Sequence, residues 1–265
     1  MDYGNSTDLT VTTEGTLGIT AEIDGKAVSV IGYTIPISGL DAGNHTLTVT
    51  TIPDEKHTAV SQTAEIIINK LNTTISAKDS TYVINYGGKY SITVKDVNGN
   101  VLSGKNVTFT LNGENIGSVT TNTNGVATIS LTSKILKAAK AGKKDFVIKF
   151  AGDSNYNGSS KTVKLTVKKE KTKIDAKNKN FKSNTKVKKL TITLKNSKGK
   201  GVKKVKVTLK IKGQKAITAK TNSKGKATFK IKTLKKKGKY TAKITYKGNN
   251  YYNKATKNVK ITVKK

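Results

Sequence analysis

The sequence contains neither arginine nor cysteine, and each absence excludes something. All fifty of its basic side chains are therefore lysines. Base-specific reading of nucleic acids relies on the planar, bidentate guanidinium group, so the lack of arginine weighs against a nucleic-acid partner. Without cysteine, neither disulfide bonds nor a thiolate metal site can stabilise the fold.

Long apolar runs are absent as well. No stretch approaches the roughly 18 apolar residues that cross a membrane as a helix. The chain starts with MDYG, which lacks the basic and apolar parts of a secretion signal. If the protein is exported, we therefore expect the present sequence to be a fragment of a longer one.

Groups for catalysis are scarce. The two histidines, His45 and His57, have no serine or cysteine partner in a recognisable motif, and no glycine-rich phosphate loop is present. His57 aligns with Tyr156 and Tyr252 of two later segments, so we interpret it as a packing residue. We predict a protein that is not an enzyme and that has no catalytic residues, no cofactor and no metal site.

Repetition organises the chain. Residues 43–70, 142–169 and 238–265 align without gaps, and residues 95–131 recur as 195–231 at a constant offset of 100. In each closing segment a glycine opens a run with apolar residues at alternate positions, and a second such run follows a polar turn. This period of two predicts antiparallel strands buried on one face.

The repeats predict an all-β fold of tandem immunoglobulin-like (Ig-like) Greek-key sandwiches, with domains at 1–70, 71–169 and 170–265. The first domain is short, so we expect its N-terminal strands to be missing. A two-residue turn is predicted at Asp24-Gly25, and a helical crossover within 132–141. The expected strands are 18–23, 28–31, 47–51, 64–68, 73–77, 90–95, 106–111, 117–121, 126–131, 146–150 and 163–167.

Four segments carry a resemblance to a known family. TNTNGVATISL (121–131) and TNSKGKATFKI (221–231), with the later FAGDSNYNGSS (150–160) and YKGNNYYNKAT (246–256), resemble bacterial Ig-like repeats of intimin/invasin-type and adhesin-like surface proteins. The lysine-rich, arginine-free style is similar to adhesin-like proteins of methanogenic archaea. This resemblance implies an Ig-like sandwich fold and a place on the cell surface, and it names no ligand.

Charge rises steeply along the chain. Residues 1–70 hold three lysines against nine acids (net −6), residues 71–169 fourteen against five (+9), and residues 170–265 thirty-three against two (+31). Lysines alternate with apolar residues in the third domain, which predicts a charged coat on the outer faces of both sheets. The residues predicted to contact a polyanion are Lys204, Lys206, Lys210, Lys212, Lys230, Lys232, Lys247 and Tyr251.

Two further motifs allow more than one interpretation. Asp96-Val-Asn98-Gly99-Asn100 has the spacing of the start of a calcium loop but lacks the closing glutamate, so an ordinary hairpin turn is favoured. Glycosylation sequons occur at Asn5, Asn44, Asn72, Asn106 and Asn157, and none lies in the lysine-rich domain.

The sequence thus predicts a non-catalytic, adhesin-like stalk at the cell surface or wall. Its basic end would associate with an anionic envelope polymer and its acidic end would meet a surface receptor that the sequence does not name. The alternative is a polyanion-binding module, for an acidic polysaccharide or a nucleic acid, that acts through its lysine-rich third domain.

Overall fold

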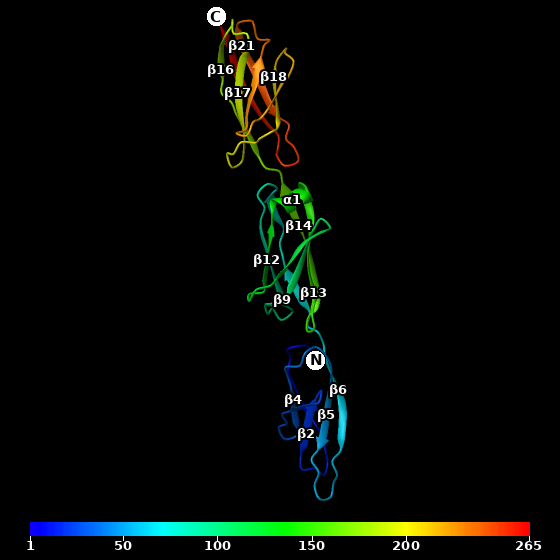
Figure 1. Cartoon of the computed structure of the whole chain (residues 1–265). Coiled ribbons are helices and arrows are strands. Elements are labelled where there is room, and N and C mark those ends of the chain that lie inside the picture. Colours follow the sequence, from blue (N-terminus) through cyan, green and yellow to red (C-terminus); the bar gives the residue numbers. More distant parts are fainter. The chain divides into compact units, whose positions relative to one another are not determined.

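The computed structural model describes residues 1–265, and its strands form six sheets (Figure 1). The residues gather into two compact units. Unit 1 consists of Met1–Lys78, Tyr90–Ile129 and Asp145–Val163, and unit 2 of Asp79–Lys89, Ser130–Lys144 and Lys164–Lys265. We call the sheets of strands β1–β6, β7–β14 and β15–β22 the first, middle and third sandwiches, and the division into units runs through the middle one.

The first sandwich combines a two-stranded sheet, β1-β4, with a four-stranded sheet in the order β3-β2-β5-β6. Its core includes Ile35, Ile37 and Leu47, which are almost completely buried. Asp24 and Gly25 have φ values of 51° and 74°, so both residues of the predicted turn adopt the left-handed conformation that such hairpins require. The strands are β1 Thr7–Thr10, β2 Ile19–Ile23, β3 Lys26–Val28, β4 Thr34–Ile37, β5 Gly43–Thr51 and β6 Ser61–Ile68.

Strands β1 and β4 were not predicted, and residues 28–31 were wrongly assigned to one strand. Strand β3 ends at Val28, and the chain turns before β4 begins at Thr34. Alternation is visible in β4 only over four residues, one of which is a proline, and β1 is exposed along its whole length. Neither strand therefore carries a clear period of two.

The middle sandwich packs a three-stranded sheet, β12-β9-β7, against a five-stranded sheet, β11-β10-β13-β14-β8. The chain crosses from one sheet to the other after β7, β8, β9 and β11, and through a helix after β12, which gives the predicted Greek-key sandwich. The elements are β7 Thr73–Ser76, β8 Ser80–Val83, β9 Gly88–Asp96, β10 Asn106–Leu111, β11 Glu114–Thr120, β12 Val126–Leu131, α1 Ser133–Ala139, β13 Gly142–Gly152 and β14 Asn157–Lys168.

Helix α1 forms at the predicted crossover. The Thr132 hydroxyl accepts a hydrogen bond from the Ile135 backbone N–H, which caps the helix, and Leu136 is fully buried. One strand of this sandwich, β8, was missed. It is short, half-buried and parallel to β14, so its sequence lacks both the length and the alternation of the other strands.

The third sandwich repeats this plan without a helix. Its sheets have the orders β15-β17-β20 and β16-β22-β21-β18-β19. The shorter crossover still buries Leu234, at 2% exposure. The strands are β15 Thr172–Asp175, β16 Lys179–Lys182, β17 Lys188–Asn196, β18 Lys206–Ile211, β19 Ile217–Lys220, β20 Lys226–Ile231, β21 Gly238–Tyr246 and β22 Ala255–Lys264.

The recurring TN-x-x-G-x-AT motif has a specific structural role. Gly125 has a φ of 69°, and a Cβ atom there would lie 2.8 Å from the Val94 carbonyl oxygen. Gly225 has a φ of 73°, and the corresponding distance to the Leu194 oxygen is 2.5 Å. Both the left-handed conformation and the close approach therefore require glycine.

The three closing turns confirm the gapless alignment of the repeats. In each turn the first residue accepts hydrogen bonds through its side-chain Oδ1 from the backbone N–H groups two and three residues later. Its own N–H donates to the carbonyl oxygen of the third residue after it. The first residues of these turns are Asp54, Asp153 and Asn249.

Candidate functional site

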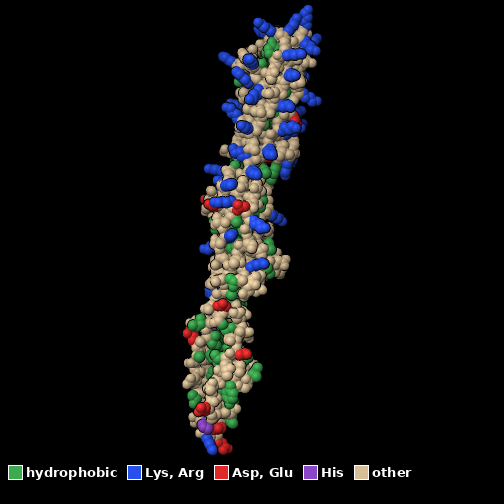
Figure 2. Space-filling model, turned by 180° about the vertical axis from the view of Figure 1, so that it is seen from behind, with side chains coloured by type: hydrophobic (Ala, Val, Ile, Leu, Met, Phe, Trp, Pro, Cys, Tyr) green, Lys and Arg blue, Asp and Glu red, His purple; other side chains and the backbone are tan.

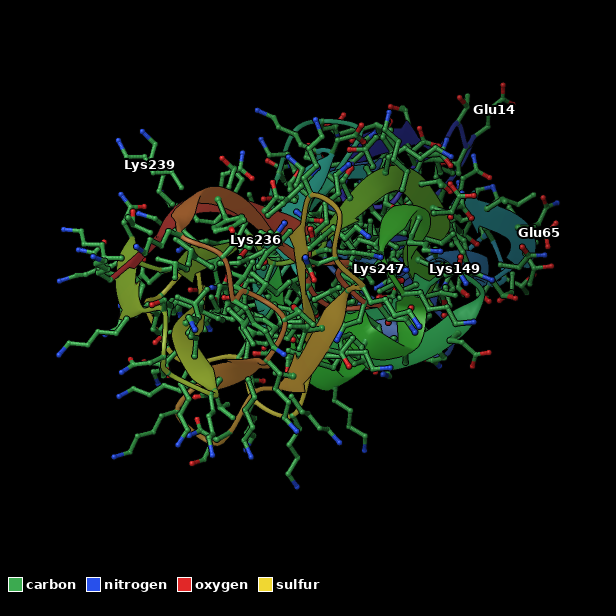
Figure 3. The ribbon with its side chains drawn as sticks, turned by 90° about the horizontal axis from the view of Figure 1, so that it is seen from above. Glu14, Glu65, Lys149, Lys236, Lys239 and Lys247 are labelled. Atoms are coloured by element: carbon green, nitrogen blue, oxygen red, sulfur yellow. The ribbon has the colours of Figure 1, made fainter.

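The predicted lysine coat is present on the third sandwich. Lys206 and Lys210 lie on β18 of the five-stranded sheet, and Lys230 lies on β20 of the three-stranded sheet. All three are exposed, as are Lys204, Lys212, Lys232 and Lys247 in the adjoining loops. Figure 2 shows lysine side chains over this sandwich, whereas acidic and apolar side chains predominate over the first. In Figure 3 the Lys239 side chain, from β21, extends away from the ribbon.

Several of these lysines face one another directly across neighbouring strands. The paired positions are Lys206 with Lys220, Lys210 with Lys243, Lys189 with Lys230, and Lys173 with Lys195. Directly opposed like charges destabilise a sheet. In the middle sandwich the positions equivalent to the first two pairs are Asn106 with Thr120 and Thr110 with Val147. The third sandwich therefore carries a repulsion that nearby anions would relieve.

The third sandwich also lacks acids where the middle one has them. Asp79 accepts a hydrogen bond from the Lys164 N–H, and Asn178 accepts the equivalent bond from Lys260, both at 2.8 Å. The Oδ1 of Asp96 accepts from the Asn100 N–H, and that of Asn196 accepts from the Lys200 N–H, again at 2.8 Å. In the closing turns, Asp153 of the middle sandwich likewise corresponds to Asn249 of the third.

The two acids that remain in residues 170–265 are both engaged. Asp175 lies 2.6 Å from the Lys195 ammonium, whose hydrogen bond holds the pKa of that carboxyl below its ordinary value. Glu170 is only 1% exposed and accepts hydrogen bonds from Asn85 at 2.8 Å and Ser197 at 2.9 Å within unit 2. Neither acid therefore presents a free negative charge to an approaching polyanion.

One lysine departs from the surface pattern. Lys188 is 2% exposed, and its ammonium donates to the backbone oxygens of Thr185 at 2.7 Å and Ser183 at 3.3 Å. It stabilises the loop before β17 and is not available to a ligand. Alternation in β17 puts Lys188 on the buried face, in phase with Leu190 and Ile192, although a lysine is not expected there.

The two tyrosines of the third closing turn have different surroundings. Tyr251 is 39% exposed, and the Lys137 ammonium lies 5.3 Å from its ring centroid. Tyr252 packs against the core of the third sandwich and is half-buried. Burial raises the pKa of its hydroxyl.

His57, interpreted as a packing residue, lies at the surface of the first sandwich. Its side chain is 53% exposed and lies 2.8 Å from the Asp54 carboxylate. The alignment of the turn is correct, but this turn of the first sandwich leaves the side chain in solvent. His45 bonds to Asp24 at 2.6 Å and to the Asp41 carbonyl oxygen at 2.8 Å, and these two hydrogen bonds raise its pKa. The side chains of both histidines bond to carboxylate or carbonyl oxygens, and no serine or cysteine is among these partners.

The Asp96 motif forms a hairpin turn. The carboxylate of Asp96 accepts hydrogen bonds from both nitrogens of Asn100, and Gly99 has a φ of 89°. No group of three or more histidine, cysteine, aspartate or glutamate side chains lies together in residues 1–265.

The five sequon asparagines are all exposed. The Asn157 amide donates to the Asn72 side-chain oxygen at 2.8 Å and to the Lys70 carbonyl oxygen at 3.2 Å. The Asn44 amide donates to Glu65 at 2.6 Å. A sugar on Asn44 or Asn157 would displace these hydrogen bonds, whereas Asn5 and Asn106 have no such constraint.

The family comparison bears on the middle sandwich. The family model for the bacterial Ig-like domain, group 3, matches residues 73–168. The match covers the whole of the middle sandwich from β7 to β14, so this sandwich is similar to bacterial Ig-like domains. The resemblance that the repeated segments suggested is thereby confirmed for this part of the chain, and the third sandwich repeats the same strand order.

Solved structures similar to this chain are also tandem proteins. A three-domain I-band fragment of titin, I67–I69, is 13% identical, with 100% of this chain and 94% of that chain covered and a TM-score of 0.41. The bacterial integrin-binding protein invasin is 17% identical over 73% of this chain and 39% of its own, with a TM-score of 0.43. A bacterial ice-binding adhesin is 12% identical over 98% and 92%, with a TM-score of 0.32.

At TM-scores below 0.5 these likenesses carry no argument about function. Among curated proteins, none matches the chain. No helix in the structure has the length and apolar character needed to cross a membrane.

Proposed function

We propose that the chain is a non-catalytic, adhesin-like repeat protein of the cell surface, and that its third sandwich associates with an anionic polymer of the cell envelope. The bacterial Ig-like family of the middle sandwich supports the adhesin-like class. The arrangement of charge on the third sandwich supports the polymer. Under this proposal the acidic first sandwich does not bind the polymer and is free to meet a surface receptor.

The observation that carries the proposal is the set of lysines opposed across strands, including Lys206 with Lys220 and Lys210 with Lys243. A fold gains nothing from such pairs, because like charges directly opposite each other weaken a sheet. A bound polyanion turns them into a favourable feature, since each neutralised phosphate, sulfate or carboxylate releases counter-ions.

The third sandwich has asparagine where the middle sandwich has aspartate, and this difference also supports the proposal. Asn178, Asn196 and Asn249 keep the hydrogen-bond acceptor that the backbone needs while removing a negative charge. The third sandwich is therefore uncharged at positions where the middle sandwich, with the same hydrogen bonds, has an acid. The positive charge of the lysines is spread over both sheets. Such a distribution favours binding of a flexible polymer over binding of a small ligand.

The second candidate is a polyanion-binding module for nucleic acid. The same lysines favour it, but the chain has no arginine for base edges, and its exposed large aromatic side chains are only Tyr33 and Tyr251. Binding single strands usually needs several aromatic platforms as well as charge.

The test is retention of the full chain on heparin, DNA and an anionic wall polymer across a salt series. Replacing Lys210, Lys212, Lys230 and Lys232 with glutamine should shorten retention and flatten the slope of log affinity against log salt. The matched control replaces Lys134, Lys143, Lys149 and Lys161 of the middle sandwich, which changes the net charge equally. Elution of the unaltered chain from all three below physiological salt would overturn the proposal, as would equal losses in both variants.

A further inference from the structure

The middle and third sandwiches differ at one corresponding place beside the closing turn. In the middle sandwich the Lys105 ammonium lies 2.6 Å from the Asp153 carboxylate and 4.3 Å from the centre of the Tyr156 ring. In the third sandwich the equivalent residues are Val205, Asn249 and Tyr252. The backbone framework is unchanged, because the hydroxyls of Thr121 and Thr221 accept from the N–H groups of residues 105 and 205.

This exchange leaves a groove in the third sandwich. A long cationic side chain has been replaced by valine, and the groove beside it has a volume of about 430 Å³. That volume falls in the range of about 300–1,000 Å³ typical of sites for small ligands. Its walls include Val205, Thr208, Tyr246 and Asn249, and two lysines, Lys206 and Lys247, flank it.

Tyr246, one residue of the groove wall, carries a buried hydroxyl without a hydrogen-bond partner. Tyr246 stands where the middle sandwich has Phe150, so the third sandwich has added a hydroxyl to an otherwise similar core. The side chain is 3% exposed and its oxygen has no hydrogen-bond partner. Burial raises the pKa of this hydroxyl to about 12, so it remains protonated and able to donate at neutral pH. An unsatisfied buried hydroxyl is unfavourable for folding alone, which points to a ligand.

Asn249 supplies a second free donor. Its Oδ1 accepts from the backbone N–H groups of Tyr251 and Tyr252, both at 2.9 Å, so its amide nitrogen is left for other partners. The equivalent atom in the middle sandwich, Oδ2 of Asp153, is occupied by Lys105. Replacing this acid with an amide also removes the one negative charge that would repel an anion here.

We propose that this groove is a specific subsite for one acidic sugar unit, carrying a carboxylate or a sulfate, of the polymer that the third sandwich binds. The lysines Lys206 and Lys247 would pair with the acid group. The Tyr246 hydroxyl and the Asn249 amide would donate to sugar oxygens, and Val205 would cover an apolar face of the ring. The inference rests on the proposed function, because it names the unit recognised within a diffuse electrostatic association.

A sugar acid fits better than a phosphate. The groove offers single hydroxyl and amide donors of the kind that match ring hydroxyls, and an apolar wall that a phosphate would not use. It lacks the bidentate guanidinium and the convergent backbone N–H groups that phosphate sites commonly have.

The experiment uses the full chain and short defined oligomers: an oligouronate, a sulfated oligosaccharide and an inorganic oligophosphate, titrated by calorimetry at physiological salt. Two variants probe the groove. Tyr246→Phe restores the residue of the middle sandwich and removes only the hydroxyl. The double variant V205K/N249D places a lysine and an acid where Lys105 and Asp153 stand in the middle sandwich, and it leaves the net charge unchanged.

We expect saturable binding of the uronate or the sulfated oligomer to the unaltered chain. Tyr246→Phe should weaken it about tenfold, as the loss of a well-placed hydrogen bond does. The double variant should abolish it, while retention on polymer columns stays the same because the charge is the same. The reverse change in the middle sandwich, K105V/D153N, serves as the control and should leave the titration unchanged. Thermal unfolding of each variant checks that it folds.

Two results would overturn the inference. If both groove variants bind the acidic oligosaccharides as the unaltered chain does, the groove is not the site. If only the oligophosphate responds to the variants, the class of ligand is wrong. Failure of the unaltered chain to be retained on any anionic polymer would instead contradict the proposed function itself, so the two failures are distinguishable.

Discussion

The middle and third sandwiches are built on one framework and differ by 22 charges, with +9 in residues 71–169 and +31 in residues 170–265. The turns explain how one fold accommodates both. Where the middle sandwich caps a turn with Asp79 or Asp153, the third uses Asn178 or Asn249, and the hydrogen bonds to the backbone are the same. The turn requires an acceptor oxygen and not a charge. Net charge is therefore free to vary without a change of fold.

The buried side chains of the two sandwiches also differ at equivalent positions. Phe109, Ile129 and Phe146 of the middle sandwich correspond to Leu209, Phe229 and Ala242 of the third, and all six are buried. One sandwich has two phenylalanines where the other has one, at a different position. Cores tolerate such exchanges when volume and pattern are retained.

The largest effect should come from the single phenylalanine in the core of the third sandwich. Phe229→Ala should lower the free energy of unfolding by about 3–5 kcal/mol, because it removes a fully buried ring. Lys230→Gln, at the next and exposed position, should change it by less than about 0.5 kcal/mol. Hydrogen exchange of peptides from the third sandwich, measured in the full chain, gives both values. Similar values for the two variants would show that the register of β20 is wrong.

The next largest effect should come from low pH, which should destabilise the middle sandwich more than the third. Burial alone raises the pKa of Asp153, but the Lys105 hydrogen bond and the Asn155 N–H outweigh it and hold that pKa below the ordinary 3.8. A depressed folded pKa contributes stability above the unfolded pKa that is lost as pH falls through the folded value. The middle sandwich should therefore weaken below about pH 4 at this site, whereas the third, with Asn249, should not.

Asp153→Asn tests the assignment. It should reduce the acid dependence of hydrogen exchange in the β13–β14 turn, and Lys105→Val should reduce it too, because the cation that depresses the pKa is gone. At neutral pH, Lys105→Val removes the ion pair of a carboxylate that is 34% exposed and still accepts two backbone hydrogen bonds, so it should cost no more than about 1 kcal/mol. An unchanged acid profile in both variants would mean that other carboxylates of the middle sandwich account for it.

Much of this framework could be predicted from the sequence, because period-two alternation determines which face of a strand is buried. Strands β10 and β12 were predicted at their observed bounds, and the glycines at 99, 113 and 125 and their counterparts all have positive φ. Strands β1, β4, β8 and β16 were not predicted. Each is only four residues long, and three of them have no fully buried side chain, so no alternation marks them.

The candidate site was predicted only in part. The exposure of the lysines follows from alternation within a strand, but the facing of Lys206 and Lys220 depends on which strands are neighbours and in what register. Tyr246 was predicted as an apolar core residue, and its unpartnered hydroxyl is visible only in three dimensions. The domain boundaries at 70 and 169, the missing strands of the first domain and the use of the sequons remain predictions.

Removing one lysine of an opposed pair should change the free energy of unfolding by a smaller amount, mainly at low salt. Lys220→Thr introduces the residue of the middle sandwich, Thr120, and removes the charge facing Lys206. It should stabilise the third sandwich by about 0.2–1 kcal/mol. The control, Lys239→Thr, removes the same charge from a lysine that faces Thr262.

Measurements at high salt test whether the stability gained by Lys220→Thr is electrostatic. Exposed charges are screened within about 3 Å at 1 M salt, so the advantage of Lys220→Thr should disappear there. A short acidic oligosaccharide should remove it as well, by pairing with both lysines of the unaltered chain. An advantage that persists at high salt would instead reflect the better strand propensity of threonine, and the repulsion would not be the cause.

The smallest effect should come from restoring an acid to a turn of the third sandwich. Asn178 accepts one hydrogen bond from the Lys260 N–H, through the same oxygen that Asp79 uses for Lys164. Asn178→Asp keeps that oxygen, so the free energy of unfolding should change by less than about 0.5 kcal/mol. Asn178→Ala removes it and should cost about 1 kcal/mol. Hydrogen exchange around Lys260, within β22, measures both. If the aspartate variant is as unstable as the alanine variant, the Asn178 amide does more than accept this hydrogen bond. The third sandwich then does not tolerate a negative charge at this position.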